Sequence, residues 1–132
     1  MFAKEKKLPA IKSLIGEGVV VTGEIRFTEG LRIDGHVHGD VVSDGDARSI
    51  IVISENAKVH GKVSAHHVII NGEVHGPVLS AELLELQPKA RVVGDIRYDT
   101  LEMHPGALVD GELKPLKSGD KPALKLAASN DA

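Results

Sequence analysis

The sequence predicts an all-β protein, a single-stranded parallel β-helix (β-solenoid) of about six triangular rungs with a disordered tail at each end. Three observations support this prediction. A Gly-x-aliphatic triplet recurs along the chain, apolar and polar residues alternate within each repeat, and aromatic residues make up only 2% of the 132 residues. Internal repetition at a short and nearly constant period is the sequence signature of a solenoid.

The triplet Gly-x-(Val/Ile/Leu) divides the chain into six units of 16–19 residues. Its glycines are separated by 16, 22, 15, 18 and 17 residues, and they are Gly23, Gly39, Gly61, Gly76, Gly94 and Gly111. The units begin at Leu14, Leu31, Ile50, Val68, Leu84 and Leu101. A unit this short has room for short strands and corners but cannot bury its own apolar face, so it must stack on its neighbours.

Within a unit, apolar residues alternate with polar ones, which is the pattern of a strand with one buried face. In the fifth unit we expect Leu84, Leu86, Ala90, Val92 and Ile96 to point inward, and Glu85, Arg91 and Asp95 to point outward. Two units have a shorter corner, at Gly35 and Gly72. A small antiparallel sandwich with Gly turns is the alternative, but it does not explain why the triplet returns in the same phase.

The shortage of aromatic residues indicates a narrow bore filled by Val, Ile, Leu and Ala. The chain contains Phe2, Phe27 and Tyr98 and no Trp. We expect a large ring to disrupt the spacing of the layers, whereas each buried branched aliphatic side chain stabilises the fold by roughly 1.5–3 kcal/mol. The core is therefore predicted to be aliphatic.

Composition excludes several classes of protein. A chain without Cys has no disulfide, no thiol catalysis and no cysteine-based metal site, and it fits a reducing compartment. No apolar run resembles a signal peptide or approaches the roughly 18 residues of a transmembrane helix, so we expect a cytoplasmic protein.

The net charge of −3 divides into +3 over residues 1–13, +2 over 114–132 and −8 between them. Because an acidic body with few rings is a poor surface for nucleic acid, no nucleic-acid partner is expected.

The two ends of the chain fall outside the repeats. We expect a flexible membrane-targeting tail over 1–13, a polymerisation domain over 14–114, and a disordered tail containing Pro and Lys over 115–132. The N-terminal residues that combine a small apolar wedge with cations for anionic lipid are Met1, Phe2, Lys4, Lys6 and Lys7. Each such cation contributes about 1 kcal/mol near an anionic leaflet. The alternative is an ordinary solvated peptide.

The ends of the solenoid suggest self-assembly. An open solenoid leaves unpaired strand edges, and such edges template the addition of another chain. Neither end shows a helix-like cap, and both keep the core pattern. The predicted polymer interface consists of Ile15, Val19, Val21 and Ile25 at one end and Leu101, Met103, Val109 and Leu113 at the other. The alternative is a monomer whose ends are capped by the tails.

Seven histidines raise the question of a metal site. His38, His60 and His75 each precede a triplet glycine, so we expect an outward column of rings about 5 Å apart. We favour a solvated ladder over a zinc site, because no second set of ligands is evident. Protonation of the column would make assembly sensitive to pH below about pH 6.5. The other four histidines are expected on the surface. No catalytic residue, metal or cofactor is predicted, since the chain has no Ser-His-Asp order, P-loop or dinucleotide motif.

The segments IDGHVHGDV, AKVHGKV, INGEVHGPV, ARVVGDI and ALVDGELKP closely resemble the bactofilins, a family of bacterial cytoskeletal proteins that form polymers. The resemblance covers residues 14–115 and extends to a short N-terminus that opens Met-Phe-x-Lys. It implies a right-handed β-helix; the residues alone do not fix the hand.

The resemblance also implies a function. Such chains stack end to end without nucleotide or metal, and like ends meet, so that the filaments have no polarity. The filaments lie at the inner face of the cytoplasmic membrane, reached through the short N-terminal peptide, and they localise proteins of cell-wall synthesis or hydrolysis and of morphogenesis. Glu5 beside Lys6 and Lys7 departs from that pattern and bears on the strength of membrane binding.

Two other classes are possible alternatives. Acyltransferases with left-handed β-helices also use coils of about 18 residues, but they show strict hexapeptide repeats and a catalytic His between subunits. A monomeric adaptor or metal-binding module is the other, with the His38, His60 and His75 column as its metal site. Acyl-CoA binding and zinc titration distinguish these alternatives from a filament.

Overall fold

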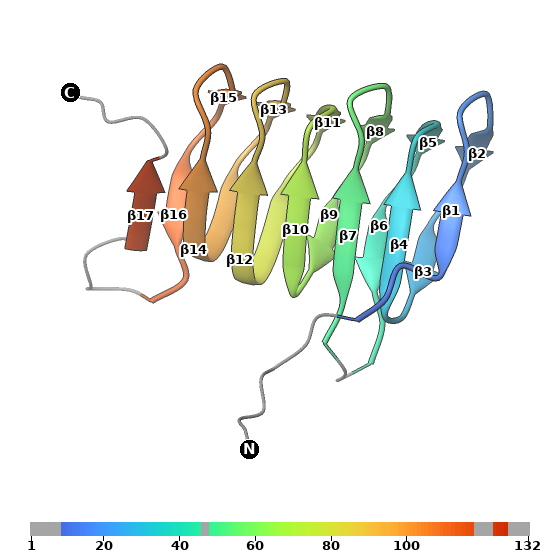
Figure 1. The fold of residues 1–132 in the computed structure, drawn as a ribbon, viewed down its shortest axis with the longest axis horizontal. Coiled ribbons are helices and arrows are strands. Elements are labelled where there is room, and N and C mark those ends of the chain that lie inside the picture. Colours follow the sequence, from blue (N-terminus) through green and yellow to red (C-terminus); the bar gives the residue numbers. More distant parts are fainter. Residues whose placement is uncertain (1–8, 46–47, 118–122, 127–132) are drawn as a thin grey trace.

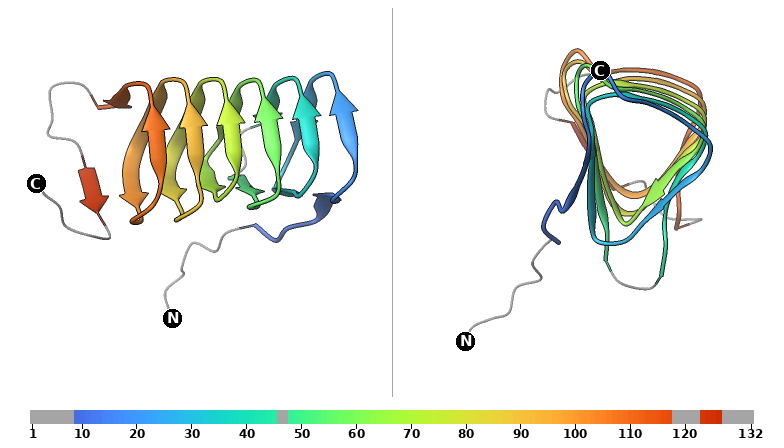
Figure 2. Two further views of the ribbon diagram at one scale, coloured as in Figure 1. Left: turned by 90° about the horizontal axis from the view of Figure 1, so that it is seen from above. Right: turned by 90° about the vertical axis from the view of Figure 1, so that its right-hand side faces the viewer.

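The computed structural model describes residues 9–45, 48–117 and 123–126, and of the last four it describes the backbone. These residues form a parallel β-solenoid of about six turns, which confirms the predicted fold class (Figure 1). Viewed along its axis, the chain winds around a triangle (Figure 2). Residues 1–8, which include the predicted membrane-targeting Met1, Phe2, Lys4, Lys6 and Lys7, lie outside the described residues.

The strands lie on three faces, and every pairing between rungs is parallel. Face A contains β1 (Ser13–Ile15), β4 (Gly30–Ile33), β7 (Ile50–Ile53), β10 (His67–Ile70), the ends of β12 (Val78–Leu86) and β14 (Ile96–Met103), and β17 (Ala123–Leu126). Face B contains β2 (Val20–Thr22), β5 (His36–His38), β8 (Lys58–His60), β11 (Glu73–His75), β13 (Arg91–Val93) and β15 (Leu108–Asp110). Face C contains β3 (Ile25–Phe27), β6 (Val41–Ser43), β9 (Val63–Ala65), the beginnings of β12 and β14, and β16 (Leu113–Pro115).

Aliphatic side chains form columns along the bore. On face A, Ile33 pairs with Ile53 and Ile53 with Ile70, and all three side chains are fully buried. The fifth rung follows the predicted alternation, since its five expected inward residues are all at most 1% exposed: Leu84, Leu86, Ala90, Val92 and Ile96. The period-2 pattern therefore identified the buried side of the strands in this rung.

The triplet glycines form a column in which backbone packs directly on backbone. Each has a positive φ, for example +155° at Gly61, which L side chains rarely adopt. A Cβ atom added to Gly61 would overlap the carbonyl oxygen of Gly39 in the preceding rung, and the same overlap recurs from Gly39 to Gly111. Only a residue without a side chain lets successive rungs approach to strand spacing at this corner.

Two aromatic rings lie inside the bore, contrary to the expectation that a ring would disrupt the layers. Phe27 is 8% exposed and Tyr98 is 2% exposed. Phe27 pairs with Ser43, and Tyr98 pairs with Ser80 and Pro115, so each ring has a serine in an adjacent rung of its column. The prediction of a purely aliphatic core was wrong because the room beside a ring depends on its neighbours in adjacent rungs.

The register of the first rung differs by one residue from the repeat as written. Leu14 pairs with Arg32, and Ile15 pairs with Ile33. Leu14 is therefore the counterpart of an outward residue, and its side chain is 61% exposed. Ile15 is the first inward residue of face A, as the predicted interface requires.

The segment 115–132, expected to be a disordered tail, includes one strand that the expectation did not contain. β17 pairs in parallel with the end of β14, Leu124 beside Leu101. The remainder of this tail beyond residue 117 lies outside the described residues.

Replacing Gly61 with Ala should lower the free energy of unfolding by at least about 3 kcal/mol, because the new Cβ meets the Gly39 backbone and φ is unfavourable. Urea unfolding followed by circular dichroism measures the loss. The matched control is Gly45→Ala, where φ is +86° but no atom lies within 4 Å, so only about 1 kcal/mol of strain is expected. Equal losses in the two variants would show that backbone stacking is unimportant.

Candidate functional site

The N-terminal end of the solenoid is an open triangle of strand edges. β1, β2 and β3 each pair with one strand, in the second rung, and no described strand lies on their outer side. Ile15, Val21 and Ile25 point into the bore but are only partly buried, because no rung covers them. Unpaired backbone groups and half-buried apolar side chains thus coincide at this end.

Val19 and its neighbours extend this apolar end. Val19 precedes β2 in the corner column that Ala57 and Ala90 occupy in later rungs, and it is 45% exposed whereas both alanines are buried. Ile11, Leu14 and Val20 are also large, apolar and exposed. Val20 is in register with His36, an outward position, so an apolar residue replaces a polar one at the last rung before solvent.

The C-terminal end is open on two faces. Among the described strands, β15 and β16 have no neighbour beyond them, and Leu113 is 38% exposed while Val109 is partly buried. On face A, where β17 follows β14, Leu101 is fully buried and Met103 is partly buried. Among the described strands, the two ends of the solenoid therefore differ: all three faces are open at the N-terminal end, but only faces B and C are open at the C-terminal end.

The structure brings the eight predicted interface residues into two layers, one at each end. Seven retain some exposure; Leu101 does not. Sequence analysis missed Val20 and Leu108, which lie at opposite ends of one outward column of face B and are 61% and 57% exposed. The sequence did contain a signal for them, because both are apolar residues at a position of the repeat that is polar or charged in the rungs between them.

His38, His60 and His75 form the predicted outward column on face B. Their ring centroids are 5.2 and 4.8 Å apart, and the rings are within 13° of parallel. Stacked rings direct their nitrogen atoms alongside one another, so they do not converge on one ion as tetrahedral zinc requires. His75 Nε2 lies 2.7 Å from Glu73 Oε2.

The pKa of His60 is lowered, first by partial desolvation between the two neighbouring rings and then by the charges of His75 and His38. Lys58 acts in the same direction, whereas Glu73 acts against it. The column therefore disfavours protonation of its central ring.

His67 is buried, contrary to the expected surface position. It is 9% exposed, its Nε2 has no hydrogen-bond partner among the described residues, and burial lowers its pKa. Its neighbour His66 is partly buried, and His66 Nδ1 lies 3.0 Å from Ser49 Oγ. Ser49, just before β7, thus lies beside the start of β10, a contact that the repeat pattern alone did not indicate.

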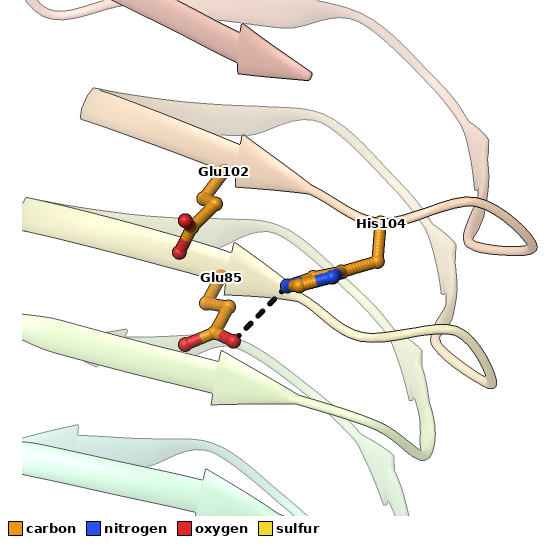
Figure 3. Close-up of side chains that lie close together, drawn as sticks. All are labelled: Glu85, Glu102 and His104. Carbon is orange, nitrogen blue, oxygen red and sulfur yellow. Dashed lines mark hydrogen bonds and ion pairs between the residues drawn. The ribbon is translucent and has the colours of Figure 1, made fainter. Parts of the chain in front are cut away.

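Glu85, Glu102 and His104 lie together on the outer side of face A near the C-terminal end (Figure 3). Their potential ligand atoms are all within 4.8 Å of one another. His104 Nε2 is 3.2 Å from Glu85 Oε2, and Gln87 Nε2 donates to the same oxygen at 3.3 Å. The histidine therefore contacts the carboxylate of the adjacent rung, which by itself accounts for the cluster.

Replacing His60 with Gln should flatten the dependence of stability on pH. A His whose folded pKa lies below its unfolded value of 6.5 gives full stability above that pH, and the contribution is lost as pH falls toward the folded pKa. Urea midpoints at about pH 7 and pH 5 measure this dependence. His36→Gln is the control, because His36 is exposed on the same face and has no ring contact among the described residues. An unchanged pH dependence in His60→Gln would contradict the assignment; the buried His67 supplies a residual dependence of the same sign.

The described residues form no helix long and apolar enough to cross a membrane. A family profile described as "Bactofilin: Polymer-forming cytoskeletal" matches residues 13–114. Two curated relatives from Myxococcus xanthus (strain DK1622) are similar. Bactofilin BacO is 29% identical over 101 residues, which cover 76% of this chain and 77% of that protein. Bactofilin BacP is 27% identical over 117 residues, which cover 87% of this chain but 47% of that protein.

No solved structure matches this chain significantly. The profile overlaps all six predicted repeats, whose glycine column and open ends are described above. The profile describes a structural protein of the cytoskeleton, and this decides against the acyltransferase alternative. The chain belongs to the bactofilin family of polymer-forming cytoskeletal proteins, and it is not an enzyme.

Proposed function

We propose that this bactofilin assembles end to end through its terminal rungs. The observation that supports this most directly is the N-terminal end, where three strands have open outer edges around half-buried Ile15, Val21 and Ile25. A second copy placed there would pair the backbone edges and bury the apolar layer. Apolar burial contributes roughly 25 cal/mol per Å², and the contact needs neither nucleotide nor metal.

Like ends meet in the proposed filament, N-terminal end to N-terminal end and C-terminal end to C-terminal end. Each contact is then isologous, with the same layer presented by both copies. Because a solenoid has two such ends, the two contacts together extend without closing. The filament has no polarity, as the family resemblance implies.

Replacing Val21 with Arg should abolish filaments and leave a folded chain. At a free end the guanidinium reaches water, but in the junction it is buried without a partner, which costs several kcal/mol. Negative-stain electron microscopy and sedimentation measure assembly, and circular dichroism measures folding. Val109→Arg tests the other end in the same way.

The matched control is Val93→Arg, the same chemical change at an outward position of rung five, where Val93 is 43% exposed. It should leave filaments intact. Filaments that persist in Val21→Arg and Val109→Arg would show that the interface lies elsewhere.

We further propose that residues 1–7 bind anionic lipid and place the filament on the inner face of the cytoplasmic membrane. The described part of the N-terminal segment supports this, because it is attached to the solenoid. The amide of Lys12 donates to the carbonyl oxygen of Gly30 at 3.1 Å, and Lys12 Nζ lies 2.8 Å from Glu29. Lys12, which follows this peptide in the chain, is therefore held against the solenoid. A filament would present many copies, so weak single contacts add up.

Replacing Phe2 with Ser should remove most binding to anionic vesicles, since the apolar wedge is lost while the cations remain. Co-sedimentation with vesicles containing phosphatidylglycerol measures binding, with pure phosphatidylcholine as the reference. The control Phe2→Leu keeps the wedge and should bind nearly as wild type. Undiminished binding of Phe2→Ser would exclude the peptide as the anchor.

The three lateral faces stay accessible in such a filament, and we propose that they localise proteins of cell-wall synthesis or hydrolysis and of morphogenesis. The scaffold role rests on the family resemblance, and the residues that contact such partners are not assigned. The monomeric adaptor is the competing function, and the Val21→Arg experiment separates the two.

A further inference from the structure

The C-terminal end has one strand more on face A than on the other faces. β17 adds to β14 with Thr100 beside Ala123, Leu101 beside Leu124, Glu102 beside Lys125 and Met103 beside Leu126. Among the described residues β15 and β16 receive no such neighbour, and β1, β2 and β3 receive none at the opposite end. The chain therefore supplies its own seventh strand on one edge out of six (Figure 1).

The residues of β17 match that edge in type. The order Leu-Lys-Leu over 124–126 is in register with Leu-Glu-Met over 101–103. Apolar positions of β17 are thus in register with apolar positions of β14, and position 125, a Lys, is in register with position 102, a Glu. In the last rung, Leu101 is fully buried and Met103 is partly buried on face A, while Leu113 on face C is 38% exposed.

We propose that β17 occupies the edge of β14 that a second copy would otherwise use, so that it competes with the C-terminal junction while the N-terminal junction stays free. The proposal rests on the proposed end-to-end assembly. It assigns the face A edge, Thr100–Met103, as an interaction surface with two alternative occupants: β17 of the same chain, or the last rung of another copy.

β17 and a second copy cannot occupy this edge together if the junction between two copies is flat. One extra strand raises face A by about 4.8 Å above the edges of β15 and β16. A second copy that contacts all three edges at once needs a level layer, so β17 must leave first. An attached strand has a local concentration in the millimolar range, which makes it an effective competitor of a dilute second copy.

The experiment isolates the C-terminal end by using the Val21→Arg chain, in which the N-terminal junction is blocked. In that background, Leu124→Asp with Leu126→Asp removes the apolar match of β17 to β14 and leaves the length of the tail unchanged. The matched control places the same two charges outside β17, as Ala127→Asp with Ala128→Asp. Sedimentation equilibrium of each chain gives the dissociation constant of the C-terminal dimer.

The dissociation constant of the C-terminal dimer should be about tenfold lower for the β17 variant than for its control. This is the ratio expected if the edge of β14 is free about one tenth of the time in a chain with an unaltered β17. Hydrogen exchange should show faster exchange of the β14 amides in the monomeric β17 variant than in the control. With Val21 restored, the β17 variant should form filaments at a correspondingly lower protein concentration.

Equal or weaker dimerisation of the β17 variant would overturn the proposal, and weaker dimerisation would place β17 inside the junction as part of it. A different result is expected if the proposed end-to-end assembly is itself wrong. In that case Val21→Arg alone would leave assembly unchanged, whatever the sequence of the tail.

Discussion

The packing of backbone on backbone at the triplet glycines is the constraint on which the rest of the solenoid depends. At Gly39, Gly61, Gly76, Gly94 and Gly111 an added Cβ would overlap the backbone of the rung before it. Because this corner holds no side chain, successive rungs approach to strand spacing and all three faces pair in parallel. The inward columns of Val, Ile and Leu follow, since equivalent residues then lie directly above one another.

This constraint explains which features the sequence could predict. A glycine required once per rung leaves a periodic mark, and the alternation between glycines identified the inward residues, such as Leu84 and Val92. Features that depend on contacts between particular rungs leave no periodic mark. The room for Tyr98 comes from Ser80 and Pro115 in adjacent rungs, and His67 is buried in register with Ile50 of the preceding rung.

The same limit applies to the ends of the solenoid. The repeat phase placed Ile15, Val21, Val109 and Leu113 in the terminal layers, because phase does not depend on position along the stack. Exposure does depend on it, and at the C-terminal end only face A receives a further described strand, the four residues 123–126. Such a short strand, within a tail containing Pro, Gly and Ser, is below the length at which alternation can be recognised.

Folding and assembly use the same interactions in a solenoid. Every internal rung is held by backbone pairing and by apolar side chains of the rungs on either side, and a terminal rung lacks one of these two partners. A second copy or a segment of the same chain can provide it, and the parallel edge of β14 accepts the latter. The stability of the last rung and the tendency to polymerise are therefore coupled: whatever stabilises the last rung from within the chain reduces the free energy that another copy can supply.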